Sequence, residues 1–338
     1  MSKPFPGPRP VRLHIPATLA CALMVSACAA QPGGNTLAAD DGTDACRPQV
    51  EQFDRSAAFF AAPIVAGAAV IGAGGILGTR PGIIGGLVWA ASSAAAAVTA
   101  TSYLEDRQRR AAGNADALAA TVATDIDQEN NGIAQSQQAL DSVTDCRLRE
   151  ARRVQEAARA GEIQRQVAEA RLAAMRQQAE RDLAQSRQIE QRIQARATEI
   201  GTGVAAVAPD AQTAAAPRPA PVTARVTRPV PLQAAPLPSA APVAEVPARE
   251  AVQIVPTRNE AFVAVQTPAG QPLGYAPASA FAIPASQTRA IAMPAVAGAG
   301  DAARMRTLVG TNIARRENFA ASVNDLQRAV SSGFELGT

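Results

Sequence analysis

Histidine, lysine and aromatic residues are scarce in this chain of 338 residues. His14 is the single histidine, Lys3 is the single lysine, and aromatic residues make up only 3% of the sequence. A large aromatic core is not expected, because alanine supplies much of the apolar content and buries little area per residue. The net charge of +3 is too small to indicate nucleic acid as a partner.

The N-terminal residues have the order of an export signal. Lys3, Arg9 and Arg12 precede the apolar stretch "IPATLACALMV", and "VSAC" follows at 25–28. The apolar stretch has about 11 residues, whereas a membrane-spanning helix needs roughly 20. The segment is therefore expected to be a signal peptide over 1–27.

"VSAC" resembles the lipobox of bacterial lipoproteins. The resemblance implies cleavage before Cys28, acylation of that cysteine (detectable with palmitate), and, from Ala29, sorting to the outer membrane. The alternative is an ordinary cleaved signal with a periplasmic or secreted product. Cleavage would remove His14 and Lys3, and with them histidine-based catalysis, histidine metal sites and Schiff bases. We therefore predict a non-enzymatic protein with no catalytic residue, no metal and no cofactor.

Eight glycines lie between residues 61 and 101, around the turn signal "TRPG" at 79–82. Small residues four apart allow helices to approach closely, so the segment predicts an apolar helical hairpin. It resembles the glycine-zipper hairpins of small bacterial envelope lipoproteins. Two environments stay open, insertion into a bilayer and a soluble hairpin packed on itself. The candidate helix-packing residues are Gly67, Gly74, Gly75, Gly78, Gly82 and Gly86.

The hairpin geometry makes a prediction about Cys46 and Cys146. With turns centred near 80.5 and at "NNG" 130–132, both cysteines arrive level with residues 115–116 in a three-helix antiparallel arrangement. In an oxidising periplasm two such cysteines should form a disulfide. Free thiols or an intermolecular bridge are the alternatives.

Three further segments follow. Residues 133–200 show apolar side chains at a mean spacing of 3.5 residues, which predicts one long coiled-coil helix. The Ala/Pro-rich stretch 201–300 predicts a disordered tether, whose residues 201–256 could reach about 170 Å. Residues 301–338 predict an amphipathic helix, which docks either on the protein's own coiled coil or on an envelope partner.

One patch of the predicted tether, 261–282, has a different pattern. Alternating apolar residues on either side of "PAGQPLG" suggest a hairpin. "GQPLGYAPASAF" also resembles the closing strands of bacterial SH3-like domains, in which a Gly-aromatic pair precedes a small-residue turn. We find no upstream strands to complete a barrel in the sequence, so a disordered linker is the expectation.

The sequence thus predicts an elongated all-α protein of the bacterial envelope. Its expected function is that of a lipid-anchored structural tether or oligomeric scaffold at the outer membrane. The alternative is an accessory subunit of a secretion, efflux or pilus machine, docking through the coiled coil and the C-terminal helix. The expected partners are the membrane, through the acyl chains and the hairpin, and a second copy or an envelope protein. The expected segments are 1–27 (signal), 28–45 (spacer), 46–132 (hairpin and its extension), 133–200 (coiled coil), 201–300 (tether) and 301–338 (terminal helix).

Overall fold

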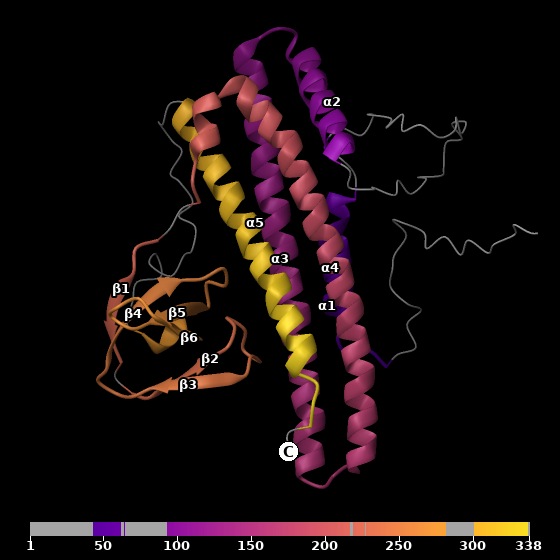
Figure 1. The fold of residues 1–338 in the computed structure, drawn as a ribbon, viewed down its shortest axis with the longest axis vertical. Coiled ribbons are helices and arrows are strands. Elements are labelled where there is room, and N and C mark those ends of the chain that lie inside the picture. Colours follow the sequence, from indigo (N-terminus) through magenta and orange to yellow (C-terminus); the bar gives the residue numbers. More distant parts are fainter. Residues whose placement is uncertain are drawn as a thin grey trace, which may run out of the picture. The chain divides into compact units, whose positions relative to one another are not determined.

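The computed structural model describes residues 43–61, 64, 93–216, 219–226, 228–281 and 301–336. Long helices dominate this part of the chain, and a small sheet lies between the fourth and fifth of them in sequence (Figure 1). The helices are α1 (Arg47–Ala57), α2 (Ser93–Ala111), α3 (Ala115–Arg159), α4 (Arg165–Val207) and α5 (Asp301–Ser332), with short 3₁₀ turns η1 (Ala58–Phe60) and η2 (Pro209–Thr213).

The single helix predicted over 133–200 is wrong, because the chain turns at residues 160–164. Gly161 adopts φ +75°, a left-handed conformation that glycine takes without steric cost and that ends α3. The turn makes α3 and α4 an antiparallel pair, in which Arg147 contacts Asp182 and Glu129 contacts Arg196. The apolar stripe itself is where the sequence placed it, since Leu172, Ala179, Leu183, Ser186, Ile189, Ile193 and Ile200 are all buried on α4.

The break predicted at "NNG" 130–132 is also wrong, because these residues lie inside α3. The buried Asn130 side chain donates to the carbonyl of Leu308 and accepts from the Asn312 amide at 3.0 Å. Gly132 gives room to the ring of Phe59, whose Cδ1 lies 2.6 Å from where a Cβ at this position would stand. A sequence that is typical of a turn is here a packing site for two neighbouring elements.

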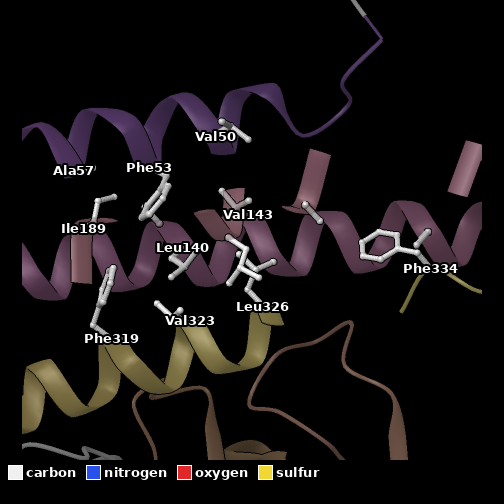
Figure 2. Close-up of a cluster of buried hydrophobic side chains, with 14 of the residues drawn as sticks. Val50, Phe53, Ala57, Leu140, Val143, Ile189, Phe319, Val323, Leu326 and Phe334 are labelled. Carbon is white, nitrogen blue, oxygen red and sulfur yellow. The ribbon is translucent and has the colours of Figure 1, made fainter. Parts of the chain in front are cut away.

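The helices share a core of aliphatic side chains and a few phenylalanines. Figure 2 shows Val50 and Phe53 of α1 on one side of α3, and Phe319, Val323 and Leu326 of α5 on the other. The apolar stripe of α5 is therefore covered by the protein's own bundle. This decides between the two docking modes that the sequence left open for the C-terminal helix.

The prediction of an all-α fold is wrong, and so is the prediction of a disordered tether for the described part of 201–281, whereas residues 282–300 lie outside the described residues. Six antiparallel strands form one sheet in the order β1-β4-β5-β6-β2-β3. Val230, Val252, Ile254, Val263 and Val265 form its buried core. The strands are β1 (Val222–Arg225), β2 (Val230–Gln233), β3 (Pro242–Val246), β4 (Ala251–Pro256), β5 (Phe262–Gln266) and β6 (Pro272–Pro277).

The expectation of a disordered linker at 261–282 is wrong, and the hairpin that the alternation suggested is present as β5 and β6. Ala264 pairs with Tyr275, and the 3₁₀ turn η3 (Ala278–Ala280) follows β6 directly. The upstream strands that seemed to be missing are β1 to β4, with β4 pairing with β5 and β2 pairing with β6. An isolated hairpin is marginal in water, and these four strands supply the additional buried surface that it needs.

In the part of the chain covered by the structure, no helix is both long enough and apolar enough to cross a bilayer. Residues 65–92, which contain all eight glycines of the predicted hairpin, lie outside the described residues, and of its second arm residues 93–101 belong to α2.

Candidate functional site

A disulfide joins the two cysteines that the sequence analysis paired. Cys46 directly precedes α1 and Cys146 lies within α3, with 5.8 Å between their Cα atoms. The predicted three-helix arrangement, with a turn at 130–132, is not the arrangement that brings the two cysteines together. Because α3 has no turn at 130–132, α1 packs directly along α3 in the opposite direction, with Cys46 at Cys146 and Phe59 at Gly132.

An ion network lies beside the disulfide, centred on Arg147, the residue after Cys146. Arg147 donates from Nη2 to Asp44 Oδ2 at 2.9 Å and from Nε to Asp182 Oδ2 at 2.8 Å. The Asp44 carboxylate also accepts from the backbone N–H of Cys46 at 2.9 Å. One guanidinium therefore connects the start of α1 with α3 and α4.

The pKa values of the two carboxylates beside Arg147 are shifted in opposite directions. Burial would raise the pKa of Asp44, but the hydrogen bonds and charge of Arg147 outweigh it and hold that pKa below its ordinary value. Burial dominates at Asp182 and raises its pKa, despite the attraction of Arg147. Asp44 is thus the carboxylate whose ionised form the network stabilises.

The other predicted site residues lie outside the described residues. These are the lipidation candidate Cys28 and the helix-packing candidates Gly67, Gly74, Gly75, Gly78, Gly82 and Gly86.

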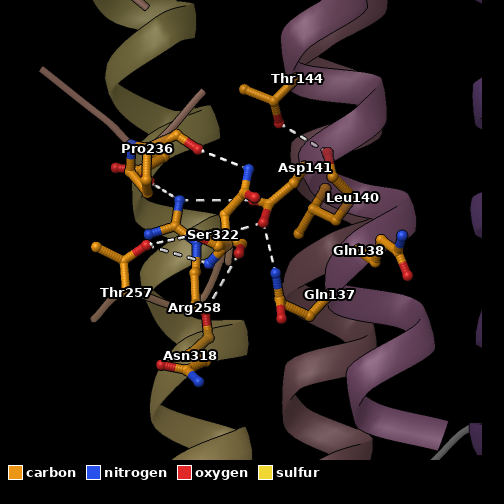
Figure 3. A network of polar contacts seen from close by, with 12 residues as sticks. Gln137, Gln138, Leu140, Asp141, Thr144, Pro236, Thr257, Arg258, Asn318 and Ser322 are labelled. Carbon is orange, nitrogen blue, oxygen red and sulfur yellow. Dashed lines mark hydrogen bonds and ion pairs between the residues drawn. The ribbon is translucent and has the colours of Figure 1, made fainter. Parts of the chain in front are cut away.

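A second ion network joins the sheet to the bundle. Arg258, in the loop after β4, enters between α3 and α5 (Figure 3). Its Nε lies 3.4 Å from Asp141 Oδ2 of α3, and its Nη2 contacts Asp325 of α5. Asp141 accepts a further hydrogen bond from Gln137 Nε2 at 2.5 Å. All three charged side chains are at least nine-tenths buried.

Burial by itself acts in opposite directions on the pKa values of the acid Asp141 and the base Arg258. Burial raises the pKa of Asp141 more than the nearby Arg258 lowers it. Burial alone would lower the pKa of Arg258, but the charges of Asp141 and Asp325 outweigh it and raise that pKa. Arg258 therefore stays a cation and compensates both buried carboxylates, together with Arg328 at Asp325.

A second contact joins the β2–β3 loop to the same face of α3. The backbone N–H of Ser239 donates to Asp145 Oδ1 at 2.7 Å, and the Ser239 carbonyl accepts from Arg152. Between this contact and Arg258, an open polar groove of about 770 Å³ runs along α3. Its residues are amides, carboxylates and arginines, with Leu237 and Pro238 at the sheet side.

The carboxylates at the junction are engaged by arginines, and the described residues include no group of three His, Cys, Asp or Glu side chains that could hold a metal ion. Comparison with models of protein families, with curated proteins and with solved structures finds no match.

Sequence reasoning missed Arg258, Asp141 and Asp325. Their separations along the chain, 117 residues for Arg258 and Asp141 and 67 for Arg258 and Asp325, leave no local pattern. The available signal was the strand alternation around Arg258, which would have placed this arginine at a hairpin end.

Proposed function

We propose that this protein is a lipid-anchored, non-enzymatic scaffold of the bacterial envelope. Its anchor would be the acylated Cys28, and its body a disulfide-bonded helical bundle that carries a six-stranded sheet. Because residues 222–277 form the strands β1 to β6, the proposal does not include a long extended tether in this part of the chain. The anchor would hold the bundle and its sheet at the membrane as a surface to which other proteins bind.

The observation that carries the proposal is the Cys46–Cys146 pair. Disulfides persist in oxidising compartments such as the periplasm and are rare in the bacterial cytosol. The pair closes a segment of 100 residues. Together with the lipobox resemblance at Cys28, it supports a place outside the inner membrane.

The experiment is metabolic labelling with palmitate followed by membrane fractionation. We expect label in the wild-type chain and in Cys21→Ser, and no label in Cys28→Ser. We also expect both Cys46 and Cys146 to resist alkylation until a reductant is added. Label that persists in Cys28→Ser, or two thiols that are alkylated without reductant, would contradict the proposal.

The alternative role is that of an accessory subunit of an envelope machine. The covered stripe of α5 no longer offers a docking surface for it, since Phe319, Val323 and Leu326 face the protein's own helices. Its support is now the polar groove beside the sheet. Crosslinking in intact cells, read out by mass spectrometry, distinguishes a homo-oligomer from a defined multiprotein complex.

A further inference from the structure

One stripe of α4 lies beside the C-terminal segment that follows α5. Its side chains recur every three or four residues, so they share one face of the helix. Together with Phe334 and Leu336, this stripe borders an open groove of about 510 Å³. Its charges alternate in sign along the helix, and a small side chain separates one opposite-charge pair from the next. The stripe consists of Arg165, Glu169, Ala173, Arg176 and Glu180.

The charged side chains of this stripe are accessible to a partner. Arg165 Nε lies 2.9 Å from Glu169 Oε1 of the same helix, and the two side chains are still 72% and 54% exposed. Arg176 Nη2 lies 3.1 Å from Glu335 Oε1 of the C-terminal segment, and the arginine is still 35% exposed. Glu180 is exposed as well. A guanidinium has five N–H donors, so each of these arginines can pair with a second carboxylate.

The order of the charges is complementary to the same order read backwards. A two-fold axis that passes between positions 172 and 173, perpendicular to α4, places the α4 of a second copy antiparallel to the first. Arg165 then stands opposite Glu180 of the second copy, and Glu169 stands opposite Arg176. The axis repeats both ion pairs, as in any two-fold contact. The exposed Ala173 lies next to the axis, where a small side chain lets two helices approach closely.

Other arrangements of the two helices bring like charges together. Parallel helices related by a two-fold axis would place each charged side chain opposite its own copy. Sliding the antiparallel helix by four residues, about one turn, in one direction would set Arg165 opposite Arg176. The same slide in the other direction would set Glu169 opposite Glu180. Because like charges across an interface are unfavourable, the stripe specifies one direction and one register.

The composition of the stripe also indicates which partner fits. Its two arginines balance its two glutamates, so a strongly acidic or strongly basic partner would meet repulsion at every second charge. A single exposed ion pair contributes only about 0–1 kcal/mol, so a partner must match the whole order of charges. The helix that matches all of it is α4 itself. Phe334 and Leu336 add apolar surface beside the stripe.

From this pattern we propose that the stripe of α4 binds a second copy of this chain, with the two α4 helices antiparallel about an axis beside Ala173. The second copy covers the groove bordered by Phe334 and Leu336. The proposal adds a partner and an interface to the scaffold function proposed above. The contact itself does not require the acylated Cys28, and its test is done without that group, so either proposal can fail alone.

The test is disulfide crosslinking of the full chain after oxidation with copper phenanthroline. Cys21→Ser and Cys28→Ser are present throughout, so that an introduced cysteine is the only free thiol. Ala173→Cys should form a disulfide-linked dimer, because the axis brings the two copies of this residue together. The control Ala184→Cys is exposed on the same helix, but its two copies stand about 35 Å apart in this register and should not be joined.

Two charge variants, each combined with Ala173→Cys, test the order of the charges. Glu169→Arg/Glu180→Arg makes the stripe entirely positive, and Arg165→Glu/Arg176→Glu makes it entirely negative. Neither should crosslink to itself, whereas an equal mixture should recover the dimer. Recovery in the mixture also shows that both variants are folded. Crosslinking through the unaltered stripe should weaken in 1 M salt, where the Debye length is about 3 Å.

Three results would overturn the proposal. The first is a chain with Ala173→Cys that stays monomeric or crosslinks no faster than Ala184→Cys. The second is crosslinking of either charge variant to itself as fast as the unaltered stripe. The third is a mixture of the two variants that gives no dimer although both melt at the temperature of the wild type. If a charge variant does not fold, the salt series with Ala173→Cys alone decides, and crosslinking that is unchanged in 1 M salt contradicts the proposal.

Discussion

Single residues decide how closely the helices of the bundle approach one another. Gly203 on α4 faces the buried ring of Tyr103, whose Cε1 lies 2.8 Å from where a Cβ at this position would stand. The Tyr103 hydroxyl donates to Asp125 Oδ2 at 2.8 Å, so the ring is held in place. Gly201 lies two residues earlier, on the other side of α4, and a Cβ at this position would meet no atom within 4 Å.

This difference predicts opposite effects for two neighbouring substitutions. Gly203→Ala should lower the free energy of unfolding by about 1–3 kcal/mol, because the methyl group overpacks a rigid contact. Gly201→Ala should raise it by about 0.5–1 kcal/mol, because alanine favours the helix and meets nothing. Urea unfolding of both variants measures the two effects, and equal shifts would contradict the prediction.

The lowered pKa of Asp44 predicts a pH-dependent contribution to stability. Its folded-state pKa lies below the unfolded value of about 3.9, so its contribution is full well above that value and is lost as the pH falls through the folded pKa. Asp44→Asn should lower the free energy of unfolding by about 1–3 kcal/mol at pH 7, because it removes a charge-assisted hydrogen bond to Arg147. The gap between wild type and variant should close toward pH 3.

Melting temperatures of both proteins between pH 7 and pH 3 check this prediction. Using the difference between the two removes the acid sensitivity that they share. A gap that stays constant down to pH 3 would show that Asp44 stabilises the fold by something other than its charge.

At the scale of elements, α1 is the helix that most depends on a covalent bond. It has only 11 residues, and its buried contacts come from Val50, Phe53 and Ala57. A Cys46→Ala/Cys146→Ala variant should lose up to about 4.7 kcal/mol, the chain-entropy contribution of a loop of about 100 residues. Hydrogen exchange should show α1 opening first. A variant with wild-type exchange in α1 would contradict this dependence.

The apolar stripes of the helices could be predicted from the sequence, whereas of the sheet only the β5–β6 hairpin left a signal that was noticed. A spacing of 3.5 residues identified the buried stripe of α4, and an apolar stripe identified α5 over Asp301–Ser332. The strands β1 to β4 were masked by alanine and proline, which together are typical of extended linkers. Their signal is a short alternation, such as Val230 and Leu232 buried on either side of the exposed Pro231.

Turn signals failed for a physical reason. "NNG" is typical of a turn when its polar groups face water, but Asn130 is buried and binds the α5 backbone at Leu308. The partner lies 178 residues away. No local reading of the sequence contains that contact, and the same holds for the Arg258 network.

At the scale of the whole molecule, Arg258 connects the sheet to the bundle. Arg258→Met would leave Asp141 buried without its arginine and Asp325 with Arg328 alone, and an unpaired buried charge typically costs about 3–5 kcal/mol. We expect a lower melting temperature and faster proteolysis within 219–281. Arg258→Met/Asp141→Asn should recover part of the loss, because one buried charge is removed as well.

Arg225→Met is the matched control for this prediction, since Arg225 is exposed on β1. It should leave both the melting temperature and the proteolysis rate unchanged. Equal effects of the two arginine substitutions would show that the junction depends on other contacts, such as that of Ser239 with Asp145.

The bond between Cys46 and Cys146 also determines how the molecule bears load. The chain leaves α1, passes through residues 65–92 and returns through α2 to α3, so the disulfide makes this path a closed ring. A pull on residues 65–92 can separate α1 from α3 only as far as Cys46, where the disulfide holds the chain to Cys146 of α3. A single proteolytic cut in the ring likewise releases no fragment until the protein is reduced.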